Sequence, residues 1–201
     1  MLNLSVKERF FFLIQYMYMV LTSILILLLV VVCVCLFVGL TTLFGYFSTG
    51  VPLVHSSETH AQAIFSAVGL GKESVFYELG SGDGRLVRLA RKMGAPRAVG
   101  FELVFWVHYY AKLVSWAKGV RVELKHTDFL QAQWSEATVV YAYLFPELLD
   151  AVVAKFYAEC PTGAVLVCKD FQAPSFAPDS VMEFESPHKA YIYVRTERLI
   201  A

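Results

Sequence analysis

The sequence has little charge and no excess of either sign. Lysine and arginine contribute 17 of the 201 residues, and aspartate and glutamate contribute another 17. Charged residues make up 17% of the chain, against about a quarter in an average soluble domain. This balance disfavours a protein that binds nucleic acid through bulk positive charge, and we expect no nucleic-acid partner. The composition also excludes a disordered or collagen-like chain.

Cysteine is scarce as well, and its four copies form no recognisable pattern. Cys33 and Cys35 lie inside an apolar run, whereas Cys160 and Cys168 lie far from it and form no CxxC pair. No cluster of histidine and cysteine accompanies them at the spacing of a structural zinc site. We therefore expect no metal.

Charge is missing altogether between Arg9 and Glu58, where the chain is dense in leucine, valine, isoleucine and phenylalanine. The densest part, residues 21–40, is long enough to cross a bilayer, which requires roughly 20 apolar residues. A cleavable signal peptide has a shorter apolar region of about 7–15 residues. We therefore expect a membrane anchor in residues 1–50, with a single span within residues 17–47. A long buried core helix and a hairpin of two spans are the alternatives, although no glycine or proline interrupts the run before Gly39. Residues 51–201 are expected to form a separate domain.

The remaining chain alternates between strand-like and helix-like segments, which predicts an α/β domain with a largely parallel sheet. Strands are expected at residues 75–79, 98–103, 120–126, 138–145, 164–170, 181–186 and 190–196. Helices are expected at residues 58–68, 84–93 and 104–118, and from Pro146 onward. The strands near residues 120–126 and 181–186 alternate apolar with charged residues and are expected at the sheet edges. The nearly continuous apolar strands at 75–79, 138–145 and 164–170 are expected at the centre.

Two helices carry side chains whose role the pattern leaves open. The helix at residues 84–93 has an apolar face and a basic face, and we expect the basic face to lie in solvent, with contact to anionic lipid as the alternative. That basic face consists of Arg85, Arg88, Arg91 and Lys92. The next helix carries an aromatic run that we expect to pack against the sheet, with a substrate cage as the alternative. The run consists of Phe105, Trp106, Tyr109, Tyr110 and Trp116.

A glycine-rich segment, residues 78–84 (ELGSGDG), links the first central strand to a helix. Glycines at every second position let the backbone approach a ligand and adopt positive φ. The helix that follows offers its first N–H groups to polar or anionic groups. Glu102 ends the second strand, 24 residues after Glu78, where a carboxylate can accept hydrogen bonds from both hydroxyls of a ribose. These features predict a nucleoside-containing ligand at the carboxyl ends of the strands.

The glycine-rich segment lacks two common nucleotide-binding motifs and resembles a third motif. Arg85 stands where a dinucleotide-binding fingerprint needs glycine or alanine, and no G-K-[ST] sequence follows. The segment instead resembles motif I (E/D-x-G-x-G-x-G) of class I S-adenosylmethionine-dependent methyltransferases. That resemblance implies a Rossmann-like, seven-stranded sheet of order 3-2-1-4-5-7-6 and S-adenosylmethionine as cofactor.

The same resemblance assigns cofactor contacts residue by residue. It implies contacts from Glu78, Gly80, Ser81, Gly82, Asp83, Gly84, Glu102 and Leu103. Asp128 corresponds to an acidic residue near the adenine amino group, and Phe129 to an apolar neighbour of the ring. A helix N-cap is the alternative role for Asp128.

A narrower resemblance covers most of the chain. The segments VPLVHSS, YELGSGDGRLV and VGFELVFWVHYYAKL follow an apolar N-terminal helix and resemble the small membrane-anchored protein-lysine methyltransferases. Eukaryotic members of that family act on the adenine nucleotide translocase and on the c-ring protein of ATP synthase, which implies a lysine of a membrane protein as substrate. Residues 54–57 lack both prolines of the family's V-P-[TS]-P segment, so only Ser56 is carried over as a cofactor contact.

Candidates near the transferred methyl group follow the fourth and fifth strands. They are Tyr143, Phe145, Lys169 and Asp170, of which Tyr143 and Phe145 are the catalytic candidates. The Tyr143 hydroxyl could hydrogen-bond an incoming amine, whereas an ordinary sheet residue is the alternative. The absence of an N-P-P-Y sequence disfavours methyltransferases that act on amino groups of DNA or glutamine.

The function expected is therefore a membrane-anchored S-adenosylmethionine-dependent methyltransferase, with the bilayer and a membrane protein as partners. The alternatives are a non-catalytic nucleotide-binding or interaction module tethered to the membrane and, third, a dehydrogenase. Lys7 and Arg9 precede the span, which by the positive-inside rule places the domain across the membrane. Because the cofactor is made inside, we expect the domain on the side that contains S-adenosylmethionine, in the cytosol or the mitochondrial matrix.

Overall fold

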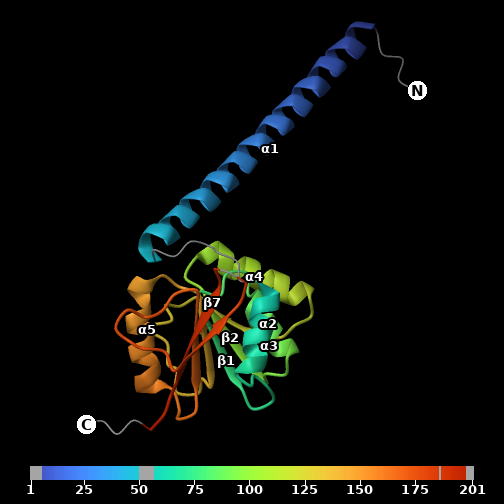
Figure 1. Cartoon of the computed structure of the whole chain (residues 1–201). Coiled ribbons are helices and arrows are strands. Elements are labelled where there is room, and N and C mark those ends of the chain that lie inside the picture. Colours follow the sequence, from blue (N-terminus) through green and yellow to red (C-terminus); the bar gives the residue numbers. More distant parts are fainter. Residues whose placement is uncertain (1–5, 50–56, 186, 198–201) are drawn as a thin grey trace. The chain divides into compact units, whose positions relative to one another are not determined.

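The computed structural model describes residues 6–49, 57–185 and 187–197 and divides the chain into two compact units, Met1–Phe44 and Gly45–Ala201. The first unit is built from most of one long helix, α1 (Val6–Thr49), whose last five residues are counted with the second unit. The second is an α/β domain (Figure 1).

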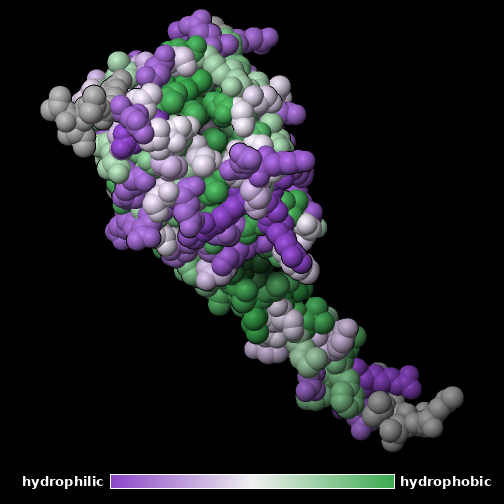
Figure 2. Space-filling view, turned by 90° about the horizontal axis from the view of Figure 1, so that it is seen from below, coloured by the Kyte–Doolittle hydropathy of each residue, from purple (hydrophilic) through white to green (hydrophobic). Residues whose placement is uncertain are grey.

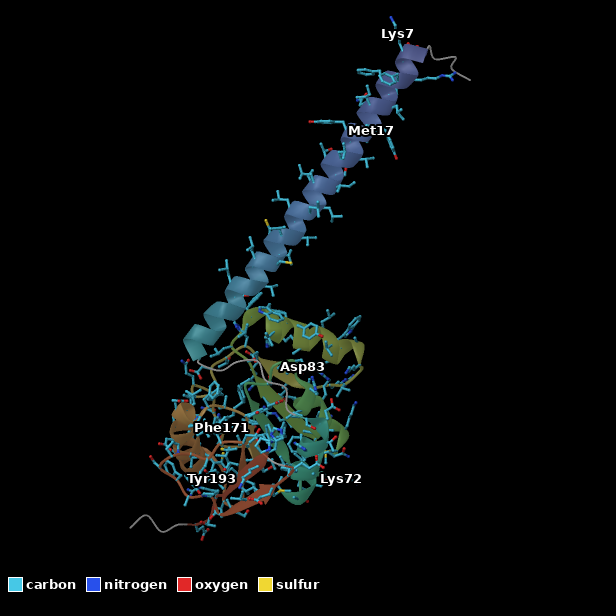
Figure 3. All side chains as sticks on the ribbon, turned by 45° about the horizontal axis from the view of Figure 1, so that its top comes forward. Lys7, Met17, Lys72, Asp83, Phe171 and Tyr193 are labelled. Carbon is cyan, nitrogen blue, oxygen red and sulfur yellow. The ribbon has the colours of Figure 1, made fainter. Side chains whose placement is uncertain are left out.

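Helix α1 is hydrophobic on all sides. Nearly all of its large apolar side chains from Phe10 to Leu40 are exposed, and they project around the whole helix (Figure 3). The surface in Figure 2 is green over much of α1, with paler patches along it and purple at its far end, whereas the domain is mixed throughout. A helix without a polar face suits a buried core or a membrane rather than water. The stretch Lys7–Thr41 is not buried in the molecule and is long and apolar enough to cross a membrane.

Three hydroxyl side chains of α1, those of Thr22, Ser23 and Thr41, hydrogen-bond to the helix's own backbone. The hydroxyl of Thr22 donates to the carbonyl of Tyr18 at 2.9 Å, and that of Ser23 donates to the carbonyl of Met19 at 2.8 Å. These hydroxyls therefore need no hydrogen bond from water. This suits a hydrocarbon environment, where polar groups must find their hydrogen-bond partners within the protein.

The domain consists of four helices and seven strands among the described residues. The helices are α2 (Glu58–Ala67), α3 (Arg85–Lys92), α4 (Phe105–Ala117) and α5 (Pro146–Glu159). The strands are β1 (Val75–Leu79), β2 (Arg97–Phe101), β3 (Glu123–Lys125), β4 (Val139–Ala142), β5 (Val165–Lys169), β6 (Ser180–Glu183) and β7 (Lys189–Val194). Helix α5 begins with proline at its first position, where a missing N–H costs nothing.

The sheet has the order β3-β2-β1-β4-β5-β7-β6, so the predicted order and the two predicted edge strands are confirmed. Strands β3, β2, β1, β4 and β5 are parallel, and β7 runs antiparallel to both β5 and β6. The edge strand β3 is shorter than expected, because only three of its residues pair with β2. Parallel pairing brings the carboxyl ends of five strands, and the amino end of β7, to one end of the sheet.

Two clusters of buried side chains cover the two faces of the sheet. One contains Phe76 together with residues of α2 and α3, and the other contains Tyr77 together with residues of α5. Successive residues of a strand point to opposite faces, which explains why the central strands read as continuous apolar runs. By the same alternation Glu78 lies on the side of α2 and α3.

The basic face of α3 is solvated only in part: Lys92 is exposed, as expected, whereas Arg88 and Arg91 bond within the domain. Arg88 is buried, with Nη1 donating to the carbonyl of Asp83 at 2.6 Å and to the hydroxyl of Ser115 at 3.2 Å. Arg91 donates to the carbonyls of Ala95 and Arg121. The reason is that α4 packs over this side of α3, which an amphipathic pattern read from one helix does not reveal.

The aromatic run of α4 also differs from expectation, because most of it faces outward. Phe105, Tyr109, Tyr110 and Trp116 are between 48% and 80% exposed. The buried side of α4 is formed by smaller or polar residues, namely Val107, His108, Ala111 and Ser115. Small side chains such as Ala111 permit the close approach to α3, and the aromatic rings are left on the opposite side.

Candidate functional site

The glycine-rich loop after β1 has the backbone conformation that its sequence predicts. Gly80, Gly82 and Gly84 have φ of +73°, +50° and +72°, a region that residues with a Cβ rarely adopt. The N–H of Ser81 donates to the carbonyl of Phe101 at 2.8 Å, which joins the loop to the end of β2. The loop is thus held open at the end of the sheet where the carboxyl ends of β1 and β2 meet.

Glu102 connects this loop to the start of α4. Its Oε2 accepts a hydrogen bond from the N–H of Gly82 at 3.0 Å, and its Oε1 accepts one from the N–H of Val104 at 2.8 Å. Burial raises the pKa of the Glu102 carboxyl, although the backbone hydrogen bonds act in the opposite direction. A carboxylate offers about four acceptor positions, and the backbone of Gly82, Val104 and Leu103 uses at most three of them, so at least one position is left for a ligand hydroxyl.

Glu78 and Ser81 supply buried polar atoms below the loop. Among the described residues, Glu78 Oε2 and Ser81 Oγ are buried without a hydrogen-bond partner. Burial, followed by the neighbouring charge of Asp83, raises the pKa of Glu78 well above its usual value. Buried polar atoms are normally paired, and those that are not call for a ligand, a water or a functional role.

Gly100 is a residue of this region that the sequence analysis missed. A Cβ built on Gly100 would lie 2.6 Å from Ser81 Oγ and 2.8 Å from Val87 Cγ2. Strand β2 therefore needs glycine at this position so that Ser81 can pack against it. A glycine inside an apolar strand is the sequence signal of such a close approach.

Asp83 stabilises the first turn of α3. Its Oδ1 accepts a hydrogen bond from the N–H of Arg85 at 3.0 Å, and its Oδ2 lies 3.7 Å from nitrogens of both Arg85 and Arg88. The side chain of Arg85 also lies 3.8 Å from Glu58 of α2. The first turns of α2 and α3 are therefore neighbours beside the glycine-rich loop.

Asp128 and Phe129 follow β3 at the same end of the sheet. Asp128 Oδ1 accepts a hydrogen bond from the N–H of Leu130 at 2.9 Å, so the carboxylate caps a turn rather than a helix. Phe129 is nearly buried, and its carbonyl accepts a hydrogen bond from Nε1 of Trp134 at 3.0 Å. Leu103 is 41% exposed next to Glu102.

The ends of β4 and β5 bring three of the expected residues together. Asp170 has φ of +63°, and among the described residues it is the non-glycine position with positive φ. Its carboxylate pairs with the buried ammonium of Lys169 and interacts with the hydroxyl of Tyr143. Burial and then this hydrogen bond raise the pKa of Tyr143 to about 12, so the phenol is neutral near pH 7.

His188, which the sequence analysis did not select, completes this group. His188 Nδ1 lies 3.0 Å from Asp170 Oδ2, and the His188 ring lies 5.3 Å from that of His60 in α2. Burial raises the pKa of Asp170, but hydrogen bonds from Lys169, His188 and Tyr143 outweigh it, and the net shift is downward. His188 lies here because it directly precedes β7, which pairs antiparallel with β5 and so begins beside the end of β5.

One expected residue lies elsewhere, and another falls outside the part of the chain that the structure describes. Phe145 precedes α5 and packs with its ring centroid 5.9 Å from that of Phe171, rather than with the group around Asp170. Ser56 lies outside the described residues, so its assignment as a cofactor contact stays a prediction.

The sheet order, the glycine-rich loop and the acidic residue after β2 together define a class I methyltransferase fold. An RNA methyltransferase from Salinibacter ruber, solved with S-adenosyl-L-homocysteine, is similar with a TM-score of 0.68 and 28% identity, over 73% of this chain and 96% of that one. An S-adenosylmethionine-dependent methyltransferase from Thiobacillus denitrificans shares the fold with a TM-score of 0.52 and 16% identity, over 62% and 54% of the two chains.

Residues 78–180 match the sequence family described as the ANTKMT methyltransferase domain, and the chain belongs to that family. The resemblance derived from the sequence is thereby confirmed. The matched segment runs from Glu78, at the end of β1, to the start of β6, so it contains the glycine-rich loop, Glu102 and Asp170.

Named relatives agree with this assignment. The adenine nucleotide translocase lysine N-methyltransferase of Mus musculus is 31% identical over 134 residues, 66% of this chain and 58% of its own. The ATP synthase c-subunit lysine N-methyltransferase of Rattus norvegicus is 32% identical over 104 residues, 51% and 48% of the two chains. The match therefore spans about half the length of these mammalian relatives. A protein-lysine N-methyltransferase of Saccharolobus islandicus is 27% identical over 72% of this chain and 93% of its own.

Proposed function

We propose that this chain is a membrane-anchored methyltransferase that transfers the methyl group of S-adenosylmethionine to a lysine amine of a membrane protein. Family membership and the methyltransferase fold support the reaction class. The observation that carries the proposal is the Glu102 carboxylate, which holds the glycine-rich loop and keeps acceptor capacity for a ligand hydroxyl.

The residues around the loop fit the cofactor. Glu102 would accept hydrogen bonds from the two ribose hydroxyls, and the three glycines would let the backbone approach the amino-acid portion. The unpaired oxygens of Glu78 and Ser81 would receive polar groups of that portion. Leu103 would contact the adenine ring, Asp128 its amino group, and Phe129 its face, whereas Asp83 would act chiefly by shaping the loop.

The cofactor, when bound, supplies an activated methyl group on a sulfonium. The chain's own contribution is to bind and orient the amine and to favour its neutral form. Tyr143 is suited to the first task, because its hydroxyl donates to Asp170 and leaves oxygen lone pairs free to accept a hydrogen bond from the amine. The carboxylate of Asp170, fixed by Lys169 and His188, would hold this hydroxyl in place. Phe145 would contribute apolar surface at most.

The membrane part of the proposal is supported by α1. Its apolar stretch from Lys7 to Thr41 suits a single-pass anchor, which makes the bilayer a partner. Relatives are named after two proteins, the adenine nucleotide translocase and the ATP synthase c-subunit. We accordingly propose a membrane-protein substrate and a domain on the side of the membrane that contains the cofactor.

A binding measurement tests the cofactor, using the full chain in detergent. Calorimetry is expected to show binding of S-adenosylmethionine and S-adenosyl-L-homocysteine and no binding of NAD. Binding of NAD instead would favour the dehydrogenase alternative.

A transfer measurement tests the reaction. Full-length protein and radiolabelled S-adenosylmethionine, added to membranes that contain ATP synthase and the adenine nucleotide translocase, are expected to label lysine, as identified by mass spectrometry. Binding of the cofactor without transfer to any membrane protein would favour the non-catalytic module.

A further inference from the structure

The outer side of α4 carries an apolar stripe with no cover from the domain. Phe105, Tyr109, Leu113 and Trp116 recur at intervals of four, four and three residues, which places them on one side of a helix. With Tyr110 beside them they form what we term the α4 aromatic face. Trp116 is 80% exposed, and the other members are between 48% and 59% exposed.

Exposed apolar side chains are otherwise rare on the domain. Of the seven large hydrophobic residues that are exposed in its described part, six lie between Leu103 and Trp116, and Val181 is the seventh. Scattered apolar residues on a surface need no explanation, but a contiguous group marks an interaction site.

We propose that the α4 aromatic face rests in the headgroup region of the bilayer, an inference that relies on the proposed membrane anchoring of α1. Tryptophan and tyrosine are the side chains enriched at the membrane–water interface, and the face contains one of the first and two of the second. Lys112 lies at its border, with Nζ 5.5 Å from the Tyr109 ring centroid, and Lys118 follows the helix. Helix α4 contains no aspartate or glutamate, so nothing on it repels anionic lipid.

The short connection between α1 and the domain favours lipid as the partner that covers the α4 aromatic face. The chain between Thr49, which ends α1, and Glu58, which begins α2, spans at most about 30 Å when fully extended. A domain held this close to a membrane meets it at a high effective concentration, so even a weakly apolar face suffices for docking. The basic residues of α3 are less suitable for this role, since Arg88 is buried and Arg91 is bonded to backbone carbonyls.

The proposed contact has a consequence for the candidate site. Helix α4 follows the carboxyl end of β2, and in Figure 1 it lies near the end of the sheet where α2 begins. This is the end that carries the glycine-rich loop and Glu102. Docking α4 would therefore turn that end of the sheet toward the membrane surface, where lysines of a membrane-protein substrate emerge.

The tryptophans provide a built-in probe. All three, Trp106, Trp116 and Trp134, lie in the domain and none in α1, and Trp134 is fully buried. The full chain is reconstituted in vesicles of phosphatidylcholine and phosphatidylglycerol, with and without brominated acyl chains that quench nearby tryptophan. Brominated lipid is expected to quench the emission, and Trp116→Phe is expected to lose most of that quenching.

Two further variants control the measurement. Leu113→Glu leaves α1 intact and is expected to abolish the quenching of Trp116 while the chain still resists alkaline extraction. Val181→Trp in the Trp116→Phe background places a probe on β6, at the opposite edge of the sheet from β3, and is expected to add no quenching to what Trp116→Phe alone retains.

Three outcomes distinguish the proposals. If Trp116 is not quenched although the chain resists alkaline extraction, the docking of α4 is overturned, whereas the proposed membrane anchoring by α1 stands. If Trp116 is quenched but alkali extracts the chain, the docking of α4 stands and the proposed membrane anchoring by α1 is overturned. Trp116 shielded from both brominated lipid and acrylamide, with cross-linked dimers, would assign the face to a second copy and overturn the docking.

Discussion

At the scale of single residues, Glu102 has two roles that a mutation would disturb together. The carboxylate holds Gly82 and Val104 and, in the proposed complex, accepts the ribose hydroxyls. Hydrogen bonds to charged groups contribute about 1.5–3 kcal/mol, and about 1.4 kcal/mol corresponds to a tenfold change in affinity. Glu102→Ala is therefore expected to weaken S-adenosylmethionine binding by about ten- to a hundredfold, measured by calorimetry.

The same substitution is also expected to lower the melting temperature, because two backbone N–H groups lose their acceptor. Glu73→Ala, at an exposed position, serves as the control and should change neither quantity. An unchanged affinity in Glu102→Ala would place the cofactor elsewhere on the domain.

Glu78 predicts a dependence of stability on pH. Its pKa in the folded chain is raised, chiefly by burial, so across the interval from the usual value near 4.5 up to the folded value the folded state holds a proton that the unfolded state has released. Its contribution to stability is therefore present at low pH and is lost as pH rises through the folded pKa. Glu78→Gln removes this loss, and its melting temperature is expected to exceed that of the wild type at about pH 8 and to match it below about pH 4.5.

The gain in stability should be accompanied by weaker cofactor binding, since an amide NH₂ replaces one of the carboxyl oxygens of Glu78, which are proposed to receive polar groups of the amino-acid portion. Glu73→Gln, at an exposed position, should leave the stability profile unchanged. Equal melting temperatures of Glu78→Gln and wild type in the alkaline range would show that ionisation of the buried Glu78 carboxyl does not destabilise the fold.

At the scale of the elements, Arg88 links the glycine-rich loop, α3 and α4. Replacing it with alanine removes the bonds to the Asp83 carbonyl and the Ser115 hydroxyl. Arg88→Ala is expected to destabilise the fold by about 1.5–3 kcal/mol, measured by urea unfolding in detergent. Lys92→Ala, exposed on the same helix, should stay within about 0.5 kcal/mol of the wild type. Equal losses in both variants would contradict the linking role.

The elements also show how much of the structure could be predicted from the sequence. The order of the strands could be predicted, because alternating and continuous apolar strands differ in how many faces are covered. The loop from Gly80 to Gly84 could be predicted because positive φ selects glycine. The environments of Arg88 and Trp116 could not, since periodicity shows that a helix has two faces but not which neighbour covers each. His188 was missed for a related reason: its position depends on the register of an antiparallel return strand.

At the scale of the whole molecule, the side of the membrane on which the domain lies is open to a direct test. The charges of Lys7 and Arg9 alone would place it opposite the cofactor, whereas the proposed reaction requires access to S-adenosylmethionine. In sealed right-side-out vesicles, a protease added outside is expected to leave the domain intact and to degrade it once the vesicles are opened. Cleavage in sealed vesicles would overturn the proposed sidedness.

The length of α1 raises the question of hydrophobic mismatch. The apolar stretch Lys7–Thr41 has 35 residues, about 52 Å at 1.5 Å each, against a hydrocarbon thickness of about 30 Å. To fit entirely within that thickness the helix would have to tilt by about 55°, beyond the usual range of up to about 40°. Its first turns, however, are rich in aromatic residues, including Phe10, Phe12, Tyr16 and Tyr18, which suit the headgroup layer. The hydrocarbon would then contain chiefly residues 21–40, about 30 Å of helix, so that an anchor that looks too long matches a bilayer of ordinary thickness.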